Sequence, residues 1–265
     1  MTTETSATTG FHLPAIRRIG FDHPWSWLAA GWRDLLKSPR VSLAYGALYA
    51  IAGCLLTYGL VSLDAWYVIL PLAAGFLLLG PILAVGLYEV SRRHAAGERV
   101  TFGTAIDAWK RNRQPLFSLG IMLTLAVLLW VYVAMFLFAI FYGRVGISMD
   151  AFFAETFFSF TSIWFLIVGV AVGAFFATIV FSMSAVAFPM IIDRPGTSAT
   201  QAVLTSLKAV KGNWWPMVLW AGLIVIFSIA GLVVIYAGLI VTLPLIGHAS
   251  FHAYRDLVAP GEKAE

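Results

Sequence analysis

One glutamate and two histidines that fall within otherwise apolar stretches have the clearest potential for chemistry. Glu89 is the only carboxylate inside a stretch long and apolar enough to cross a membrane. Ionisable side chains are costly in lipid, so those found in membrane helices commonly have a function. Arg92 and Arg93 follow Glu89 by three and four residues and can pair with it on a helix surface. An ion pair at the membrane boundary is the favoured interpretation, and a proton or substrate site is the alternative.

His248 and His252 form the second candidate, because a spacing of four residues places both imidazoles on one helix face. Two histidines supply half of a tetrahedral metal site, and Glu89 would add a third ligand if the two segments adjoin. Histidines at a boundary are more often hydrogen-bonded groups, so metal or haem ligation is the less favoured interpretation. Arg255 is typical of an interfacial anchor. The candidate polar site therefore comprises Glu89, Arg92, His248, His252 and Arg255, and its metal content is unknown.

A stripe of small residues, Gly169, Gly173 and Ala177, is the third candidate. Small side chains let two membrane helices approach closely. Packing inside the chain is the favoured use, and self-association between two copies is the alternative. No nucleotide-binding loop, zincin signature, nucleophile elbow or cysteine pair occurs, and no basic run is dense enough for nucleic acid. We therefore expect no enzymatic activity, no cofactor and no nucleic-acid partner.

The composition predicts that membrane helices position these residues. The chain is 60% hydrophobic and 11% charged, whereas soluble domains have about 25% charged residues. A soluble domain of 265 residues cannot bury that much apolar surface, but a membrane bundle can leave it facing lipid. The only cysteine, Cys54, lies within an apolar stretch, which excludes a disulfide or a cysteine cluster within one chain.

Four apolar blocks meet the length of roughly 20 residues that a helix needs to cross a bilayer. Polar residues around Asp64 divide the first block into two spans. The predicted spans are residues 41–61, 67–90, 115–141 and 160–192, with two more in the block 214–254. The last two are predicted to meet at a turn between Ala230 and Gly238, where Gly231 and Gly238 are the flexible points. The sequence thus predicts an all-α membrane protein with six transmembrane helices.

Basic residues are distributed unevenly over the predicted connections. Sixteen of the 17 Lys and Arg residues fall in segments on the side of the N-terminus, and only Arg144 falls in an opposite loop. Lys and Arg are retained in the cytoplasm. We therefore expect a multi-pass protein of the bacterial inner (plasma) membrane with both termini cytoplasmic. Residues 1–20 are predicted as a flexible cytoplasmic tail, 21–257 as a single six-span membrane domain, and 258–265 as a short cytoplasmic tail.

Short amphipathic segments precede the first, third and fifth spans, and each leads to a proline, at Pro39, Pro115 and Pro216. Helices with an apolar stripe and a basic face lie in the plane of the membrane interface. The three apolar stripes are Trp25, Leu28, Trp32 and Leu35; Phe102, Ala105, Ile106 and Trp109; and Val203, Leu207, Val210 and Trp214. In the first segment, Asp34 is assigned to the opposite, polar face.

The same order of segments therefore recurs three times along the chain. Thr101 and Ser198 are predicted as the N-caps of the second and third amphipathic helices. One interpretation is three repeated units, each a cytoplasmic amphipathic elbow helix plus a transmembrane hairpin, related by an axis near the membrane normal. The alternative is that a polytopic protein places basic amphipathic segments before its spans without any repeat.

Four stretches carry a family resemblance. They are the opening Phe21, Asp22, His23, Pro24 and Trp25, the run 80–93, the turn 189–194 and the ending 244–255. Together they resemble a bacterial family of predicted integral membrane proteins of unknown function (domain of unknown function 2189), over nearly the whole chain after residue 15. The resemblance implies an inner-membrane location and supplies no catalytic residue. The elbow and hairpin arrangement is more distantly similar to the membrane region fused to some bacterial glycerophosphodiester phosphodiesterases, whose catalytic domain this sequence lacks.

The leading functional interpretation is a non-enzymatic scaffold or accessory protein that binds partner helices or lipid. A small carrier or channel is the first alternative, with a polar path through Glu89, His248 and His252 near the cytoplasmic face. The second is a membrane metal or haem protein in which His248 and His252 are ligands. The lipid bilayer is the partner that composition requires, while other membrane proteins or a second copy of the chain stay open.

Overall fold

The structure is a computed structural model that describes residues 13–142 and 160–260. The described part of the chain is helical, and its only strand-like feature is an isolated antiparallel bridge between Ile16 and Val258. The prediction of an all-α protein is therefore confirmed. The predicted opposite-side charge, Arg144, lies outside the described residues.

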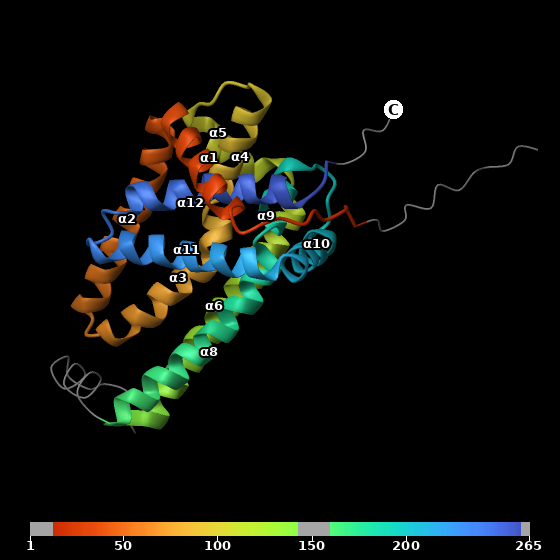
Figure 1. Cartoon of the computed structure of the whole chain (residues 1–265). Coiled ribbons are helices and arrows are strands. Elements are labelled where there is room, and N and C mark those ends of the chain that lie inside the picture. Colours follow the sequence, from red (N-terminus) through yellow and green to blue (C-terminus); the bar gives the residue numbers. More distant parts are fainter. Residues whose placement is uncertain (1–12, 143–159, 261–265) are drawn as a thin grey trace, which may run out of the picture.

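Along the chain, each short elbow helix is followed by a long helix and then by helices that return, as predicted (Figure 1). They are α1 (His23–Lys37), α2 (Pro39–Ser62), the 3-10 helix η1 (Trp66–Val68), α3 (Ile69–Leu83), α4 (Val85–Ala96), α5 (Phe102–Arg111), α6 (Arg113–Tyr142), α8 (Phe160–Ser184), α9 (Ala187–Asp193), α10 (Ala199–Gly212), α11 (Trp214–Val233) and α12 (Leu239–Leu257). Two returning helices break near their prolines, α3 to α4 at Ala84 and α8 to α9 before Pro189, as expected from the lost backbone donor. The threefold repeat itself stays a prediction.

The three elbow helices α1, α5 and α10 form where the amphipathic segments predict them. A single residue, Ser38, Asn112 or Asn213, separates each from the long helix that follows. Both predicted N-caps are confirmed. The Ser198 hydroxyl accepts a hydrogen bond from the backbone N–H of Gln201 at 3.1 Å, and Thr101 precedes α5 as its N-cap.

The assignment of faces on α1 needs a correction. Asp34, predicted on the polar face, is only 3% exposed, whereas Trp25 and Trp32 of the predicted apolar stripe are 55% and 44% exposed. The buried face of α1 instead runs through Trp27, Gly31 and Asp34. The physical reason is that α1 packs against α12 through this face, which leaves tryptophans outward, where amphipathic rings favour the membrane boundary.

Among the residues that the structure describes, five helical stretches are long and apolar enough to cross a membrane. They are Pro39–Ser62, Trp66–Ala96, Arg113–Tyr142, Ile163–Asp193 and Trp214–Val233. They match the first five predicted spans. The sixth predicted span corresponds to α12, which is not among the five and whose C-terminal half carries His248, His252, Arg255 and Asp256. The count of six is therefore not confirmed.

Helix α12 is the centre of one half of the bundle, where it packs against α1, α2, α4 and α11. Glycines permit the closest approaches. A Cβ added at Gly31 of α1 would lie 2.7 Å from the backbone N of Ala249, and one added at Gly46 of α2 would lie 2.4 Å from the carbonyl oxygen of Ile240. Helices α3, α6 and α8 form the other half, in which α6 and α8 run side by side as a long pair (Figure 1). The two long helices of the first predicted hairpin thus pack mainly on other helices, α2 on α12 and α3 on α6.

The predicted turn between the last two helices is confirmed at residues 234–238. Its left-handed residues are Ile235 and Tyr236, with φ of 47° and 63°, rather than the two glycines. Gly231 and Gly238 have another role. A Cβ added at Gly238 would lie 2.8 Å from the Cα of Gly231, so the two glycines let α11 and α12 meet closely at the turn.

Residues 13–20 run alongside the end of α12. The backbone N–H of Arg17 donates to the Leu257 carbonyl at 2.8 Å, and the N–H of Ala259 donates to the Ala15 carbonyl at 3.0 Å. The side chain of Asn213, between α10 and α11, accepts from the N–H of Ile19 and donates to the Arg17 carbonyl, both at 2.9 Å. These bonds attach the second half of the predicted N-terminal tail to the helical domain. They also place both described ends of the chain at the same end of the bundle.

Candidate functional site

A buried polar cluster joins α1, α4 and α12 around the carboxylate of Asp34. His252 Nε2 lies 2.8 Å from Asp34 Oδ2, which makes a hydrogen bond between α12 and α1. His94 Nδ1 of α4 lies 3.4 Å from Oδ1, and Lys37 Nζ lies 3.7 Å from the same oxygen, both within ion-pair distance. A buried carboxylate requires such compensation, because an unpaired charge in the interior is costly.

The polar groups around Asp34 determine whether its carboxyl is charged. Burial by itself would raise the pKa of this carboxyl, but the hydrogen bond with His252 and the nearby His94 ring outweigh it and hold the pKa below its usual range. Asp34 is therefore ionised at neutral pH. Its stabilising contribution is present above the ordinary carboxyl pKa and is lost as the pH falls below it.

His248 is fully buried one helical turn before His252 and bridges two further helices. Ser42 Oγ of α2 lies 2.9 Å from Nε2, and Ser91 Oγ of α4 lies 2.8 Å from Nδ1. Both ring nitrogens are thus used in hydrogen bonds between helices. His248 acts as a structural link, because each bond satisfies a hydroxyl that would otherwise be buried without a partner.

Glu89 belongs to a separate arginine cluster that joins α4 to α5. Its side chain is 1% exposed and accepts hydrogen bonds from Arg92 Nε at 2.7 Å, Arg92 Nη2 at 2.9 Å and Arg93 Nε at 2.9 Å. Arg111 Nε of α5 lies 3.8 Å from Glu89 and donates to the Ile192 carbonyl of α9 at 2.9 Å. The favoured sequence interpretation, pairing of Glu89 with both arginines, matches this geometry, although the pair is buried rather than at an exposed boundary.

The structure brings α4 and α12 together but does not bring Glu89 to the histidines. Ser91, which contacts His248, lies two residues from Glu89 and so about 200° around the helix. In the described chain, no hydrogen bond or ion pair joins Glu89 to either imidazole. Glu89 and His248 thus have different partners, on different faces of α4, and the shared site stays a prediction. Arg255 is exposed and lies outside both clusters.

Within residues 13–142 and 160–260, no three His, Cys, Asp or Glu side chains are arranged to hold a metal ion. Ligation by the histidine pair would require breaking the bonds of His248 to two serines and that of His252 to Asp34. The shape and chemistry of the polar clusters thus favour a structural role over a metal centre.

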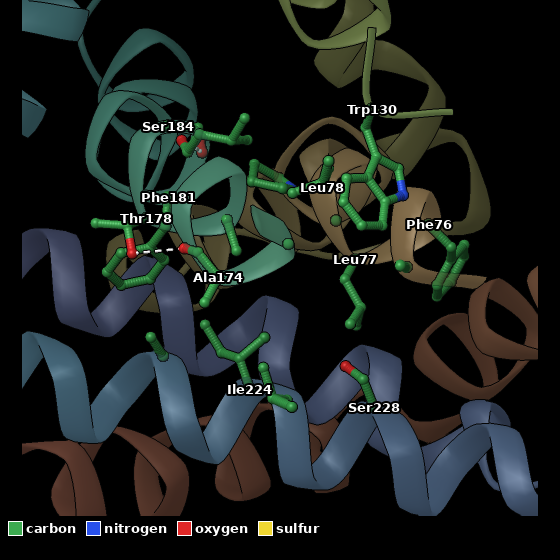
Figure 2. Close-up of a pocket in the computed structure, with 18 of the residues that line it drawn as sticks. Phe76, Leu77, Leu78, Trp130, Ala174, Thr178, Phe181, Ser184, Ile224 and Ser228 are labelled. Carbon is green, nitrogen blue, oxygen red and sulfur yellow. Dashed lines mark hydrogen bonds between the residues drawn. The ribbon is translucent and has the colours of Figure 1, made fainter. Parts of the chain in front are cut away.

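A large cavity lies between the two halves of the bundle, in the part built from apolar helices. Its volume is about 1080 Å³, at the upper end of the range of roughly 300–1,000 Å³ typical of ligand pockets. Residues of α3, α8 and α11 surround it, with Trp130 of α6 at one side (Figure 2). Labelled in the close-up are Phe76, Leu77, Leu78, Trp130, Ala174, Thr178, Phe181, Ser184, Ile224 and Ser228. Leu70, Val170 and Ile226 line the cavity and are largely exposed, so it opens to the outer surface of the bundle.

Three of the seven hydroxyl groups in this wall donate to carbonyl oxygens of their own helices. Thr178 donates to the Ala174 carbonyl at 2.8 Å, the bond drawn in Figure 2. Ser184 and Ser250 donate to carbonyls of their own helices at 2.6 and 2.8 Å. Most of the other lining residues are apolar, so the cavity offers water few hydrogen-bond partners. An apolar cavity of this kind stays dry unless an apolar group fills it.

The small-residue stripe of α8 faces this cavity and α6. Gly169, Gly173 and Ala177 all line the cavity. A Cβ added at Gly173 would lie 3.1 Å from the Trp130 ring, so this glycine lets α6 and α8 approach closely, which is the packing inside the chain that the sequence favours. Nothing lies within 4 Å of a Cβ added at Gly169, which leaves open space there.

Sequence reasoning missed Asp34, Ser42, Ser91 and His94 as members of a polar cluster. One signal was available, because Asp34 is the only acidic residue in α1. No sequence pattern indicated the cavity, since most of its lining residues are apolar side chains that lipid-facing helices also carry.

Comparison with known proteins supports an integral membrane protein. Residues 69–193, from α3 to α9, match the model of a family described as "Predicted integral membrane protein (DUF2189)", which confirms the predicted resemblance over this segment. No curated protein and no solved structure matches the chain. The protein is an integral membrane protein with several apolar helices, and the family description assigns it no activity.

Proposed function

For this integral membrane protein, we propose a non-enzymatic accessory role in which it binds lipid, with acyl chains in the cavity between α3, α6, α8, α11 and α12. The observation that supports this is the cavity itself. Protein interiors have few voids larger than a water molecule, so an apolar space of about 1080 Å³ is expected to hold an occupant. Its opening at the outer surface of the bundle gives membrane lipid direct access.

The predicted location in the bacterial inner membrane, with both termini cytoplasmic, belongs to the same proposal. The bridge between Ile16 and Val258 supports the part of this proposal that places both termini on one side, because a chain whose two ends meet on one side crosses the membrane an even number of times. The five apolar helices found within residues 13–142 and 160–260 are an odd number, so in this proposal α12 is the sixth crossing. Its charged C-terminal half would then lie near the cytoplasmic surface, bonded to α1 and α4.

Topology can be tested with reporters that are active only outside the cytoplasm. Fusions after Asp64 and Ala237 are expected to be active, and fusions after Arg99 and Thr197 inactive, because Lys and Arg stay on the cytoplasmic side. Reporter activity and protein level are measured together for each fusion. Activity at Thr197 would contradict the six-crossing model.

Filling the cavity is expected to weaken lipid binding. Gly169 and Gly222 line it, and neither would bring a new Cβ within 4 Å of another residue, so leucine at either position projects into empty space. Gly169→Leu and Gly222→Leu should each weaken binding by roughly fivefold or more, because the leucine would take space that the acyl chain fills, and overpacking costs about 1–3 kcal/mol. Binding is measured by quenching of tryptophan fluorescence with brominated acyl chains, since Trp130 and Trp220 line the cavity.

Gly59→Leu is the matched control. Gly59 lies in α2, away from the cavity, and a Cβ there also meets nothing within 4 Å. It is expected to bind lipid like the wild type, with the same phospholipid-to-protein ratio by native mass spectrometry. Equal lipid binding by all three variants and the wild type would show that the cavity is not the binding site.

A further inference from the structure

A second, smaller cavity adjoins the large one where α8 ends and α11 begins. Its volume is about 330 Å³. It is lined by Ser182, Leu207, Val210, Lys211 and Trp214. Three of these residues, Ser182, Val210 and Trp214, also line the large cavity, so the two spaces share a wall. The small cavity is therefore placed to receive the polar end of a molecule whose apolar part occupies the large one.

Lys211 provides a cation at the small cavity. Its side chain is exposed, and no other described residue forms an ion pair with it. Arg18 donates through Nη1 to the carbonyl of Gly212, which brings a second cation to the same end of α10. Neither α10 nor residues 13–20 contain an Asp or Glu. An anionic group is thus attracted to this corner without competition from a carboxylate on either segment.

The remaining lining suits the boundary between a head group and acyl chains. The Ser182 hydroxyl makes no hydrogen bond to any other described residue, so it can donate to a phosphate or ester oxygen. Trp214 is 45% exposed, and indole rings favour the level of the lipid head groups. Leu207 and Val210 continue the apolar wall toward the large cavity.

Building on the proposed lipid-binding function, we propose that Lys211 and Ser182 form a head-group site that selects an anionic phospholipid, with its phosphate in the small cavity and its acyl chains in the large one. A free phosphate would gain nothing from the adjoining apolar cavity. A zwitterionic head group would bring its own cation near Lys211 and Arg18, which is unfavourable. The chemistry thus favours a phospholipid with net negative charge.

The test compares phosphatidylglycerol and phosphatidylcholine with identical brominated acyl chains, titrated into the full-length protein in mild detergent. The wild type is expected to bind phosphatidylglycerol more tightly. Lys211→Gln should reduce that affinity roughly fivefold, as expected for one basic residue near an anionic surface, and leave phosphatidylcholine binding unchanged. Ser182→Ala should also weaken binding of phosphatidylglycerol, because the phosphate loses a donor, and an unchanged circular-dichroism spectrum is its folding control.

Lys208→Gln is the matched control, because Lys208 lies on the same helix, is exposed and does not line the small cavity. An equal loss in this variant would mean that general surface charge sets the preference, and would overturn the head-group site. Displacement of the lipid by equimolar inorganic phosphate would also overturn it. A wild type that binds both lipids equally, while Gly169→Leu blocks both, would refute the head-group site alone. Binding of neither lipid would refute the proposed function itself.

Discussion

Replacing Glu89 with Gln is expected to lower the free energy of unfolding by about 3 kcal/mol, although the two side chains have nearly the same volume. The carboxylate is buried and accepts three hydrogen bonds from Arg92 and Arg93. Glutamine has no negative charge, and its NH2 group would face guanidinium donors, so buried cations would lose their partner. Removal of one member of a buried ion pair costs about 3–5 kcal/mol. The lower end of this range applies because the side chains of Arg92 and Arg93 are 14% and 26% exposed.

Glu98→Gln is the matched control for this prediction. Glu98 accepts hydrogen bonds from the same Arg92, but its side chain is 47% exposed, so the change should cost less than about 1 kcal/mol. Unfolding is measured by circular dichroism during titration of detergent-solubilised protein with sodium dodecyl sulfate. Equal costs for the two variants would contradict a buried role for Glu89. Lipid binding should be retained in both, because neither residue lines the cavities.

Gly46→Ala is expected to destabilise the protein by about 2 kcal/mol, even though alanine is the better helix former. The added Cβ would lie 2.4 Å from the carbonyl oxygen of Ile240 and 2.8 Å from its Cα. These are backbone atoms of α12, which cannot rotate aside as a flexible side chain could. Helices α2 and α12 would have to separate, and their packing would weaken along the whole contact.

The same substitution at Gly59 is expected to have the opposite sign. Gly59 lies in the same helix, but no atom lies within 4 Å of an added Cβ, so only the gain in helix propensity of roughly 0.5–1 kcal/mol acts. Both variants are measured by the same sodium dodecyl sulfate titration. Stabilisation by alanine at both positions would show that α2 and α12 do not approach as closely as the structure indicates.

Local features of the fold could be predicted well from sequence. The elbow helices, the N-caps Thr101 and Ser198, and the turn at residues 234–238 all lie where local patterns indicate. The pairing of Glu89 with Arg92 and Arg93 was likewise available, because spacings of three and four residues are contacts within one helix. Each of these features depends on residues that are close in the chain.

Features that join distant segments were predicted poorly. The assignment of Asp34 to an exposed polar face was wrong, because the face of α1 that is buried depends on where α12 lies. His248 and His252 share a helix face as predicted, but their partners Ser42, Ser91 and Asp34 come from three other helices. A spacing rule identifies a candidate polar group, whereas its partner is set by the tertiary structure.

The sequence by itself determined that the protein is helical and lies in the membrane, because charge and hydropathy decide whether a segment can enter lipid. Only the tertiary structure decided that α2 packs on α12, that Glu89 and the His248 partner Ser91 lie on different faces of α4, and that a cavity separates the two halves of the bundle. The reason is physical. Lipid tails are as apolar as leucine, so apolar patterning does not show which helix face packs on protein and which faces lipid, and that choice depends on shape complementarity and hydrogen bonds between distant helices.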